Sequence, residues 1–257
     1  MEVQRNKQNS SEKFLKFNNS LFFLLVLIII SVAYILTIKN GSHISTLGSH
    51  LFWFSQELSA TISKMEYNLN GYVAFNKIFF FLLNHDTIND DILNQARLLK
   101  DVDSDGIFLL METDLGYQNY SLLAFSLFGY SISSLLYLYF TILIVSVCLY
   151  ILAFKNNNIY KVILLIFLLS FLLMVPAAER LGSNVAVIYS YRFMTLLAIL
   201  PLIHICLYTL DFNKNINTKF FFSVFSVIVQ SLILVLIYHV RSTIIWMFIL
   251  LLFILFI

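Results

Sequence analysis

The sequence predicts an all-α integral membrane protein, a polytopic helix bundle with a long helical external loop after its first transmembrane helix. Of the 257 residues, 60% are apolar and only 12% are charged, whereas soluble domains are about 45–50% apolar and about 25% charged. Several apolar runs have the length of a bilayer crossing. The net charge is only +2. This composition excludes a soluble enzyme, a disordered chain and a protein that binds nucleic acid, and it makes the lipid bilayer the first expected partner.

Six apolar runs predict membrane-crossing helices, because a bilayer core of about 30 Å needs about 20 helical residues. The sixth run has only 14 residues before the sequence stops, which is about 21 Å of helix. We therefore expect a C-terminally truncated fragment of a longer protein. The runs cover 21–38, 132–154, 160–175, 193–210, 220–238 and 244–257.

The distribution of basic residues predicts the orientation, because Lys and Arg collect on the cytoplasmic side. Arg5 and three lysines precede the first run, and no small-residue cleavage site follows it, which favours an uncleaved signal anchor. With the N-terminus inside, the short loops 155–161 and 211–219, each with two lysines, are also cytoplasmic. The predicted parts are a cytoplasmic tail (1–20), a first transmembrane helix (21–38), an external loop (39–131) and a transmembrane bundle (132–257).

The external loop carries ten acidic residues against five Lys and Arg, and its apolar spacing predicts helices near the membrane. One apolar stripe predicts an amphipathic helix along the membrane surface. The run 72–83 is too short to cross and predicts an interfacial or re-entrant helix. Asn89 or Asp90 can cap the next helix. Gly129 and the serines at 131, 133 and 134 are the expected break between a short helix over 121–128 and the second crossing. The stripe consists of Leu51, Phe54, Leu58, Ile62, Met65 and Leu69.

An acidic segment in this loop fits the pattern of a calcium-binding EF-hand loop in every fixed position. Alternate aspartates supply oxygen ligands, Gly106 permits a sharp turn, and a glutamate at position twelve binds the cation through both oxygens. The alternatives are an acidic turn that ends a helix, or a catalytic divalent cation such as Mg²⁺ on a phosphate. The candidate ligands are Asp101, Asp103, Asp105 and Glu112.

A second group of candidates lies at the outer ends of the later helices. Arginine outside the membrane runs against the positive-inside bias. A guanidinium group is a good ligand for phosphate, which lies at this depth in lipid headgroups. These residues therefore predict a phosphate site, with pairing to the acidic loop as the alternative. They are Arg180, Arg192, His239 and Arg241.

The order of the elements, a first helix and then a long outer loop with surface helices and acids, resembles the GT-C class of polytopic membrane glycosyltransferases. Asp114-x-Gly116-Tyr117, the residues from Leu123 to Gly129, and Tyr137-x-Tyr139-Phe140 also look like bacterial membrane proteins of this style. The resemblance implies location in the bacterial inner membrane and surface-polysaccharide biosynthesis. It also implies a polyprenyl-phosphate sugar donor and an acid in the outer loop. Because 39–53 contains no acid, we expect that acid to be Asp86, Asp90 or Asp91.

The alternative function is a non-enzymatic membrane component, or a transporter or flippase, of surface-polysaccharide export. Charged residues are confined to the ends of the apolar runs, and His204 and Gln230 are the main polar residues inside them. Ion-coupled pumps usually bury ionisable groups at this depth, so the pattern weighs against a transporter.

Overall fold

The computed structural model describes residues 19–41, 44–45, 50–67, 76–85, 87–99, 112–154, 157–180, 194–212 and 220–240, with positions 245, 246 and 249. Over these residues the fold is helical apart from one pair of two-residue strands, which confirms the all-α prediction. The elements are α2 (Asn19–Gly41), β1 (Ile44–Ser45), α3 (His50–Tyr67), α4 (Lys77–Leu83), β2 (Thr87–Ile88), α5 (Asp90–Arg97), α6 (Glu112–Phe128), α7 (Ile132–Phe154), α8 (Asn158–Arg180), α9 (Met194–Phe212) and α10 (Phe220–Val240).

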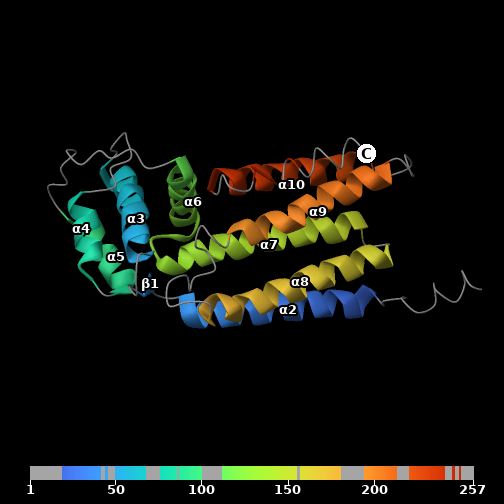
Figure 1. The fold of residues 1–257 in the computed structure, drawn as a ribbon, viewed down its shortest axis with the longest axis horizontal. Coiled ribbons are helices and arrows are strands. Elements are labelled where there is room, and N and C mark those ends of the chain that lie inside the picture. The colour runs from blue at the N-terminus through green and yellow to red at the C-terminus, as the bar shows by residue number, and fades with distance from the viewer. Residues whose placement is uncertain are drawn as a thin grey trace, which may run out of the picture.

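The helices form two parts, which we call the bundle and the head (Figure 1). The bundle consists of α2 and α7 to α10, which run side by side along the long axis. Within it α2 packs on α8, α9 packs on α10, and α7 lies between the two pairs. The head consists of α3 to α6 at one end of the bundle, together with the antiparallel pair β1–β2, in which Ile44 faces Ile88.

The bundle helices coincide with five of the six predicted runs, and most of the sixth run lies outside the described residues. Among the described residues, Asn19–Ile38 and Ile132–Phe154 are long and apolar enough to cross a membrane, judged by length and composition. Asn158–Met174, Met194–Leu210 and Val224–Val240 are shorter apolar helices. Helices α2 and α7 differ in burial. Within the protein, 67% of the apolar window of α7 is buried, against 28% of that of α2.

A buried polar network joins α7, α9 and α10 in the middle of the bundle. Ser146 Oγ donates to Gln230 Oε1 (2.9 Å), and Gln230 Nε2 donates to the Ser146 carbonyl (2.9 Å). The same amide nitrogen lies 3.5 Å from His204 Nδ1, and His204 Nε2 lies 3.1 Å from Ser226 Oγ. Because an amide NH₂ faces Nδ1, that nitrogen acts as the acceptor and the ring proton belongs on Nε2. His204 thus joins α9 to α10 through hydrogen bonds, which gives partners to polar groups that are buried away from water.

Helix α3 differs from the one-sided helix that its apolar stripe predicts, because it is buried on every side over residues 54–63. Ser55, Glu57, Ser59 and Ser63, on its other faces, are each at most 2% exposed. The helices α4, α5 and α6 surround it. The hydroxyl groups of Ser59, Thr61 and Ser63 donate to carbonyls of the preceding turn, for example Ser63 Oγ to the Ser59 carbonyl (2.6 Å). The expectation that its polar faces are exposed is wrong, because α4, α5 and α6 cover them. A position of this helix at a membrane surface stays a prediction.

Two asparagines begin the next helices of the head. Asn76 accepts from the backbone N–H of Phe79 (3.0 Å) at the start of α4. Asn89 accepts from the N–H of Ile92 (3.0 Å) at the start of α5, so Asn89 rather than Asp90 is the cap. The amide of Asn76 also donates to Ser63 Oγ (2.6 Å), which ties α4 to α3. Each cap satisfies an N–H that the helix itself leaves without a partner.

Candidate functional site at the head–bundle junction

Helix α6 joins the head to the bundle. It lies across the head end of the bundle and packs on α3, α7 and α10 (Figure 1). The predicted break is confirmed at Gly129 and Ser131, whereas Ser133 and Ser134 lie inside α7. The helix before the break begins at Glu112 rather than at Ser121. The head therefore rests on the bundle through a full 17-residue helix.

A glycine permits the closest contact at this junction. A Cβ atom added at Gly116 would overlap with the backbone carbonyl group of His239 and the nitrogen of Val240, at the end of α10. Only a residue without a side chain lets the two backbones approach this closely. Gly116 therefore fixes where α6 meets α10.

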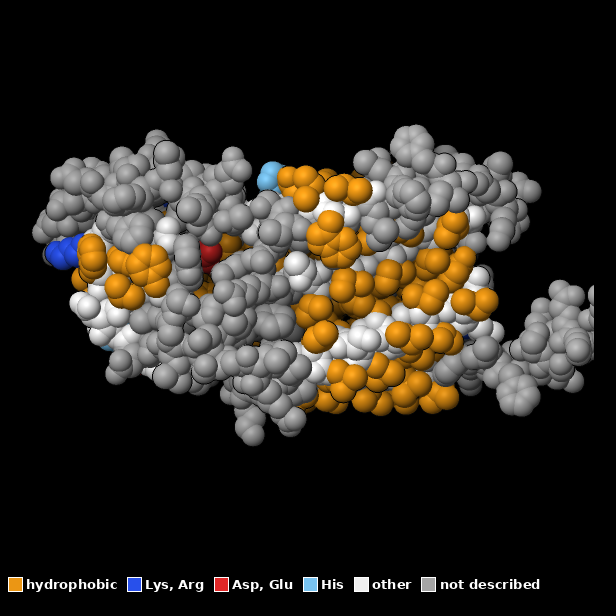
Figure 2. Space-filling view, in the orientation of Figure 1, with side chains coloured by type: hydrophobic (Ala, Val, Ile, Leu, Met, Phe, Trp, Pro, Cys, Tyr) orange, Lys and Arg blue, Asp and Glu red, His pale blue; other side chains and the backbone are white. Residues whose placement is uncertain are grey.

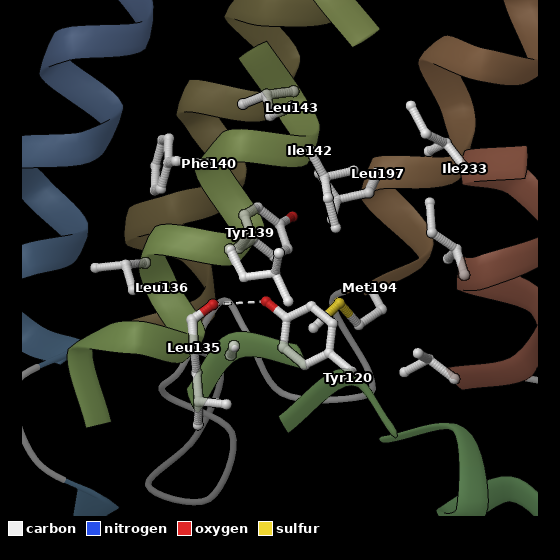
Figure 3. Close-up of a cluster of buried hydrophobic side chains, with 14 of the residues drawn as sticks. Tyr120, Leu135, Leu136, Tyr139, Phe140, Ile142, Leu143, Met194, Leu197 and Ile233 are labelled. Carbon is white, nitrogen blue, oxygen red and sulfur yellow. Dashed lines mark hydrogen bonds between the residues drawn. The ribbon is translucent and has the colours of Figure 1, made fainter. Parts of the chain in front are cut away.

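One turn further along α6, Tyr120 contacts the first turn of α7 (Figure 3). Its ring is buried among apolar side chains that include Met194 of α9. Its hydroxyl donates to the Leu135 carbonyl at 2.5 Å. A buried tyrosine needs such a partner for its O–H, so this contact fixes α6 against α7.

The turn 129–131 reverses the chain between α6 and α7. Gly129 has φ +88, a conformation that side chains rarely adopt. Tyr130 stacks on Phe125 with 5.0 Å between the ring centroids. The turn is thus a defined part of the junction.

Helix α5 holds this turn through residues near its two ends. Asp90 Oδ1 accepts from the backbone N–H of Ile132 (2.8 Å), and Asp90 Oδ2 accepts from Ser131 Oγ (3.0 Å). Seven residues later on the same face, the Arg97 guanidinium lies over the Tyr130 ring, 3.8 Å from its centroid. A carboxylate at the N-terminus of a helix is favourable there, so Asp90 stabilises the start of α7.

Arg97 also connects α5 with the end of α3. Its Nε donates to Glu66 Oε1 (2.9 Å), and the two side chains are 33% and 29% exposed. Tyr67 donates to the Arg97 carbonyl (3.1 Å). Burial raises the pKa of the Tyr130 hydroxyl above its ordinary value, and the Glu66 carboxylate adds to this. The hydroxyl therefore stays protonated at neutral pH.

A polar seam lies between α3 and α6. Gln118 Nε2 donates to the Ala60 carbonyl (3.1 Å), and Glu57, one turn before Ala60, is 2% exposed. Within the described part of the chain, Gln118 Oε1 and Ser121 Oγ are buried and have no hydrogen-bond partner. A buried acceptor without a donor costs free energy. These two oxygens could each form a further hydrogen bond.

The structure places the three predicted catalytic acids differently. Both oxygens of Asp90 are engaged by the start of α7, whereas Asp91 is exposed on the first turn of α5. Asp86 lies outside the described residues. A common site of the three carboxylates, and their catalytic role, stay predictions.

The predicted phosphate ligands share one end of the bundle as far as they are described. Arg180 is the last residue of α8, and His239 lies exposed in the last turn of α10, both at the head end (Figure 1). The side chain of Arg180, and Arg192 and Arg241 as a whole, lie outside the described residues. A common phosphate site therefore stays a prediction.

The predicted metal ligands fall mainly outside the described residues. This applies to Asp101, Asp103 and Asp105, while Glu112 begins α6 and its side chain is not described. Among the described residues, no three His, Cys, Asp or Glu side chains lie close enough to hold a metal ion. The divalent-cation site stays a prediction.

Sequence reasoning named Asp90 and Gly129 but missed other residues that build the junction. Gly116 was noticed only as part of a resemblance, although a single glycine inside a helical run is a signal of close packing. Glu57 and Gln118 were missed because a polar residue on an amphipathic helix is expected to face water.

Comparison with protein-family models, curated proteins and solved structures finds no match. The GT-C resemblance therefore stays a prediction, and the function has to be inferred from the junction and the bundle.

We predict that Gly116→Ala destabilises the protein by about 3 kcal/mol, the upper part of the range for overpacking, because the new methyl group meets backbone atoms that cannot rotate away. The measurement is thermal unfolding in detergent. Ser126→Ala, an exposed position on the same helix, is the control and should leave the melting temperature unchanged. Equal melting temperatures for both variants would contradict the close contact.

Asp90 caps α7 by accepting from the N–H of Ile132. We predict that Asp90→Ala lowers the free energy of unfolding by about 1 kcal/mol, the usual cost of losing a helix cap. Asp90→Asn should keep most of the stability, because its amide oxygen still accepts from the N–H of Ile132. Denaturant unfolding of the two variants measures the difference. If Asn is as destabilising as Ala, the Asp90 contact does not act as a cap.

Proposed function

We propose that the chain is a multi-pass membrane protein in which α2 and α7 to α10 cross the bilayer and the head stands on its outer face. The main support is the outward surface of the bundle, which is apolar over most of its length (Figure 2). In water such a surface would promote aggregation, whereas in lipid it requires no cover. Its most exposed members include Leu27 (64%), Leu152 (52%), Ile166 (58%), Leu173 (71%) and Leu232 (63%).

The two ends of the bundle differ in a way that supports this orientation. Away from the head, Lys161 is buried and donates to Asn19 Oδ1 (2.7 Å) and Asn158 Oδ1 (3.2 Å), which joins the starts of α2 and α8. This is the end where the lysine-bearing loops lie. The head end carries the acidic residues of segment 39–131 whose side chains are described, which are Glu57, Glu66, Asp90 and Asp91. The positive-inside bias then makes the head external.

We predict that a cysteine at Asn94 reacts with a membrane-impermeant maleimide on intact cells, and that a cysteine at Asn157 reacts only after permeabilisation. Asn94 is exposed on α5 and Asn157 precedes α8 at the opposite end. The chain for this measurement carries Cys148→Ala and Cys206→Ala. Labelling of both positions from the same side would overturn the proposed crossing.

The activity that we propose for the head–bundle junction is transfer of a sugar from a polyprenyl-phosphate donor. A carboxylate takes the proton of the acceptor hydroxyl, whose oxygen bonds to the anomeric carbon. The bond from that carbon to the lipid phosphate breaks, and the phosphate leaves with the negative charge. Asp91 suits the base better than Asp90, whose oxygens are engaged. The observation that supports this proposal is that Arg180, His239 and α5 all lie at the head end of the bundle.

The alternative is a non-enzymatic component, transporter or flippase of surface-polysaccharide export. Although charged residues are confined to the ends of the apolar runs, His204 in the network with Gln230, Ser146 and Ser226 supports it, because a histidine inside a membrane bundle can mark a path for substrate or protons. All four side chains are at most 1% exposed. The alternative needs no base at Asp91 and no phosphate site at the junction.

We predict that geranylgeranyl phosphate raises the melting temperature of the purified protein and that geranylgeraniol, which lacks the phosphate, does not. A ligand at about a hundredfold excess over its Kd stabilises by about 2.7 kcal/mol. The double variant Arg180→Ala/His239→Ala should lose the shift. Lys64→Ala, an exposed lysine of the head, is the control and should keep it. No phosphate-dependent shift in the unsubstituted protein would leave the export component as the remaining proposal.

A further inference from the structure

The face of α6 that rests on the bundle continues beyond it. Gly116, Tyr120, Leu123 and Leu127 are spaced by four, three and four residues, so they share one face of the helix. Gly116 and Tyr120 contact α10 and α7. Leu123 and Leu127, on the same face, are 39% and 60% exposed. The second half of α6 therefore overhangs the bundle with an uncovered apolar face.

This overhang is continuous with the apolar surface of the bundle. Phe128, at the end of α6, is 40% exposed and meets Tyr137 of α7 edge to face, with 5.9 Å between the ring centroids. Tyr137 is 36% exposed, and further along α7 Ile144 is 45% exposed. Tyrosine beside phenylalanine at the end of a crossing helix is typical of a membrane interface.

Two polar residues border this apolar strip on α6. Asn119 and Ser126 are exposed there, and the Ser126 hydroxyl donates to the Leu122 carbonyl (2.7 Å). The remaining faces of α6 are buried against α3, α7 and α10, so this strip is the part of the helix that meets its surroundings. Because α6 lies across the axis of the bundle (Figure 1), its bundle-facing side is the side that faces the membrane.

We propose that the overhang of α6, formed by Leu123, Leu127 and Phe128, lies in the outer leaflet, with phospholipid acyl chains as its partner. This inference rests on the proposed membrane crossing. Lipid then covers the same face that α7 and α10 cover in the first half of the helix. The head is thereby held at a fixed height above the membrane by both protein and lipid contacts, with the turn 129–131 at the membrane surface.

Tryptophan fluorescence tests the inference in vesicles of phosphatidylcholine brominated near the carbonyl end of the acyl chains. The protein carries Trp53→Phe and Trp246→Phe, and single tryptophans replace Leu127, Ser126 or Ile144. We expect the Leu127→Trp protein to lose about half of its fluorescence, because its ring lies about 5–10 Å into the boundary of headgroups and acyl chains. Ser126→Trp, at a polar position bordering the strip, should be quenched by aqueous acrylamide instead. Leu123→Trp tests the overhang at a second position and should be quenched by the brominated lipid in the same way.

Ile144→Trp separates this inference from the proposed function. In vesicles brominated deep in the acyl chains it should be quenched if the bundle crosses the membrane. Quenching at 144 without quenching at 123 or 127 would overturn the lipid contact and leave the crossing intact. Acrylamide quenching at 127 would mean that water covers the overhang, and protection from both quenchers would mean that a second copy covers it. Either result overturns the inference. Absence of lipid quenching at 144 overturns the crossing itself.

Discussion

The contact between the backbone of α6 and the last turn of α10 is the constraint on which the other parts of the junction depend. Gly116 makes that contact possible, since any side chain would meet the His239 carbonyl group. Once α6 is seated there, its direction brings Tyr120 to the Leu135 carbonyl and leads the chain into the turn 129–131. Helix α5 then holds this turn from both ends. A shift of α6 at one point would break contacts in three helices, because closely packed elements transmit displacements to their neighbours.

The sequence allowed the class of fold and the bounds of the bundle helices to be predicted because those depend on local signals. The length of the apolar run predicted 132–154, Gly129 predicted the break before α7, and Asn89 or Asp90 predicted the start of α5. The burial of α3 could not be predicted in this way. Its apolar stripe has the period of a one-sided helix, but α4, α5 and α6 enclose it. Periodicity reports which face is apolar, whereas burial of the other faces depends on how many neighbours the fold supplies.

The candidate site was predicted less well than the fold, and for a related reason. Asp90 and Asp91 look equivalent in the sequence, but the structure engages one with Ser131 and Ile132, about forty residues later in the chain, and leaves the other exposed. No local pattern encodes that difference. The Arg97 contacts with Glu66 and Tyr130 are similarly remote in sequence. Composition could indicate that acids gather near the membrane, but only tertiary contacts decide which carboxylate is available for chemistry.

The proposed membrane setting also gives a physical reason for the contrast between the interior of the bundle and its outer surface. Lipid is as apolar as leucine, so apolar contact alone gives little preference for one arrangement of helices over another. The hydrogen bonds among Ser146, His204, Ser226 and Gln230 have direction, and they join α7, α9 and α10 in one register. Because the network is built from neutral groups, it avoids the cost of bringing a charge into the membrane. Helices α9 and α10 are thereby held at a fixed depth relative to α7. The end of α10 then presents its backbone at the level where Gly116 meets it, so the polar interior of the bundle determines the position of the head.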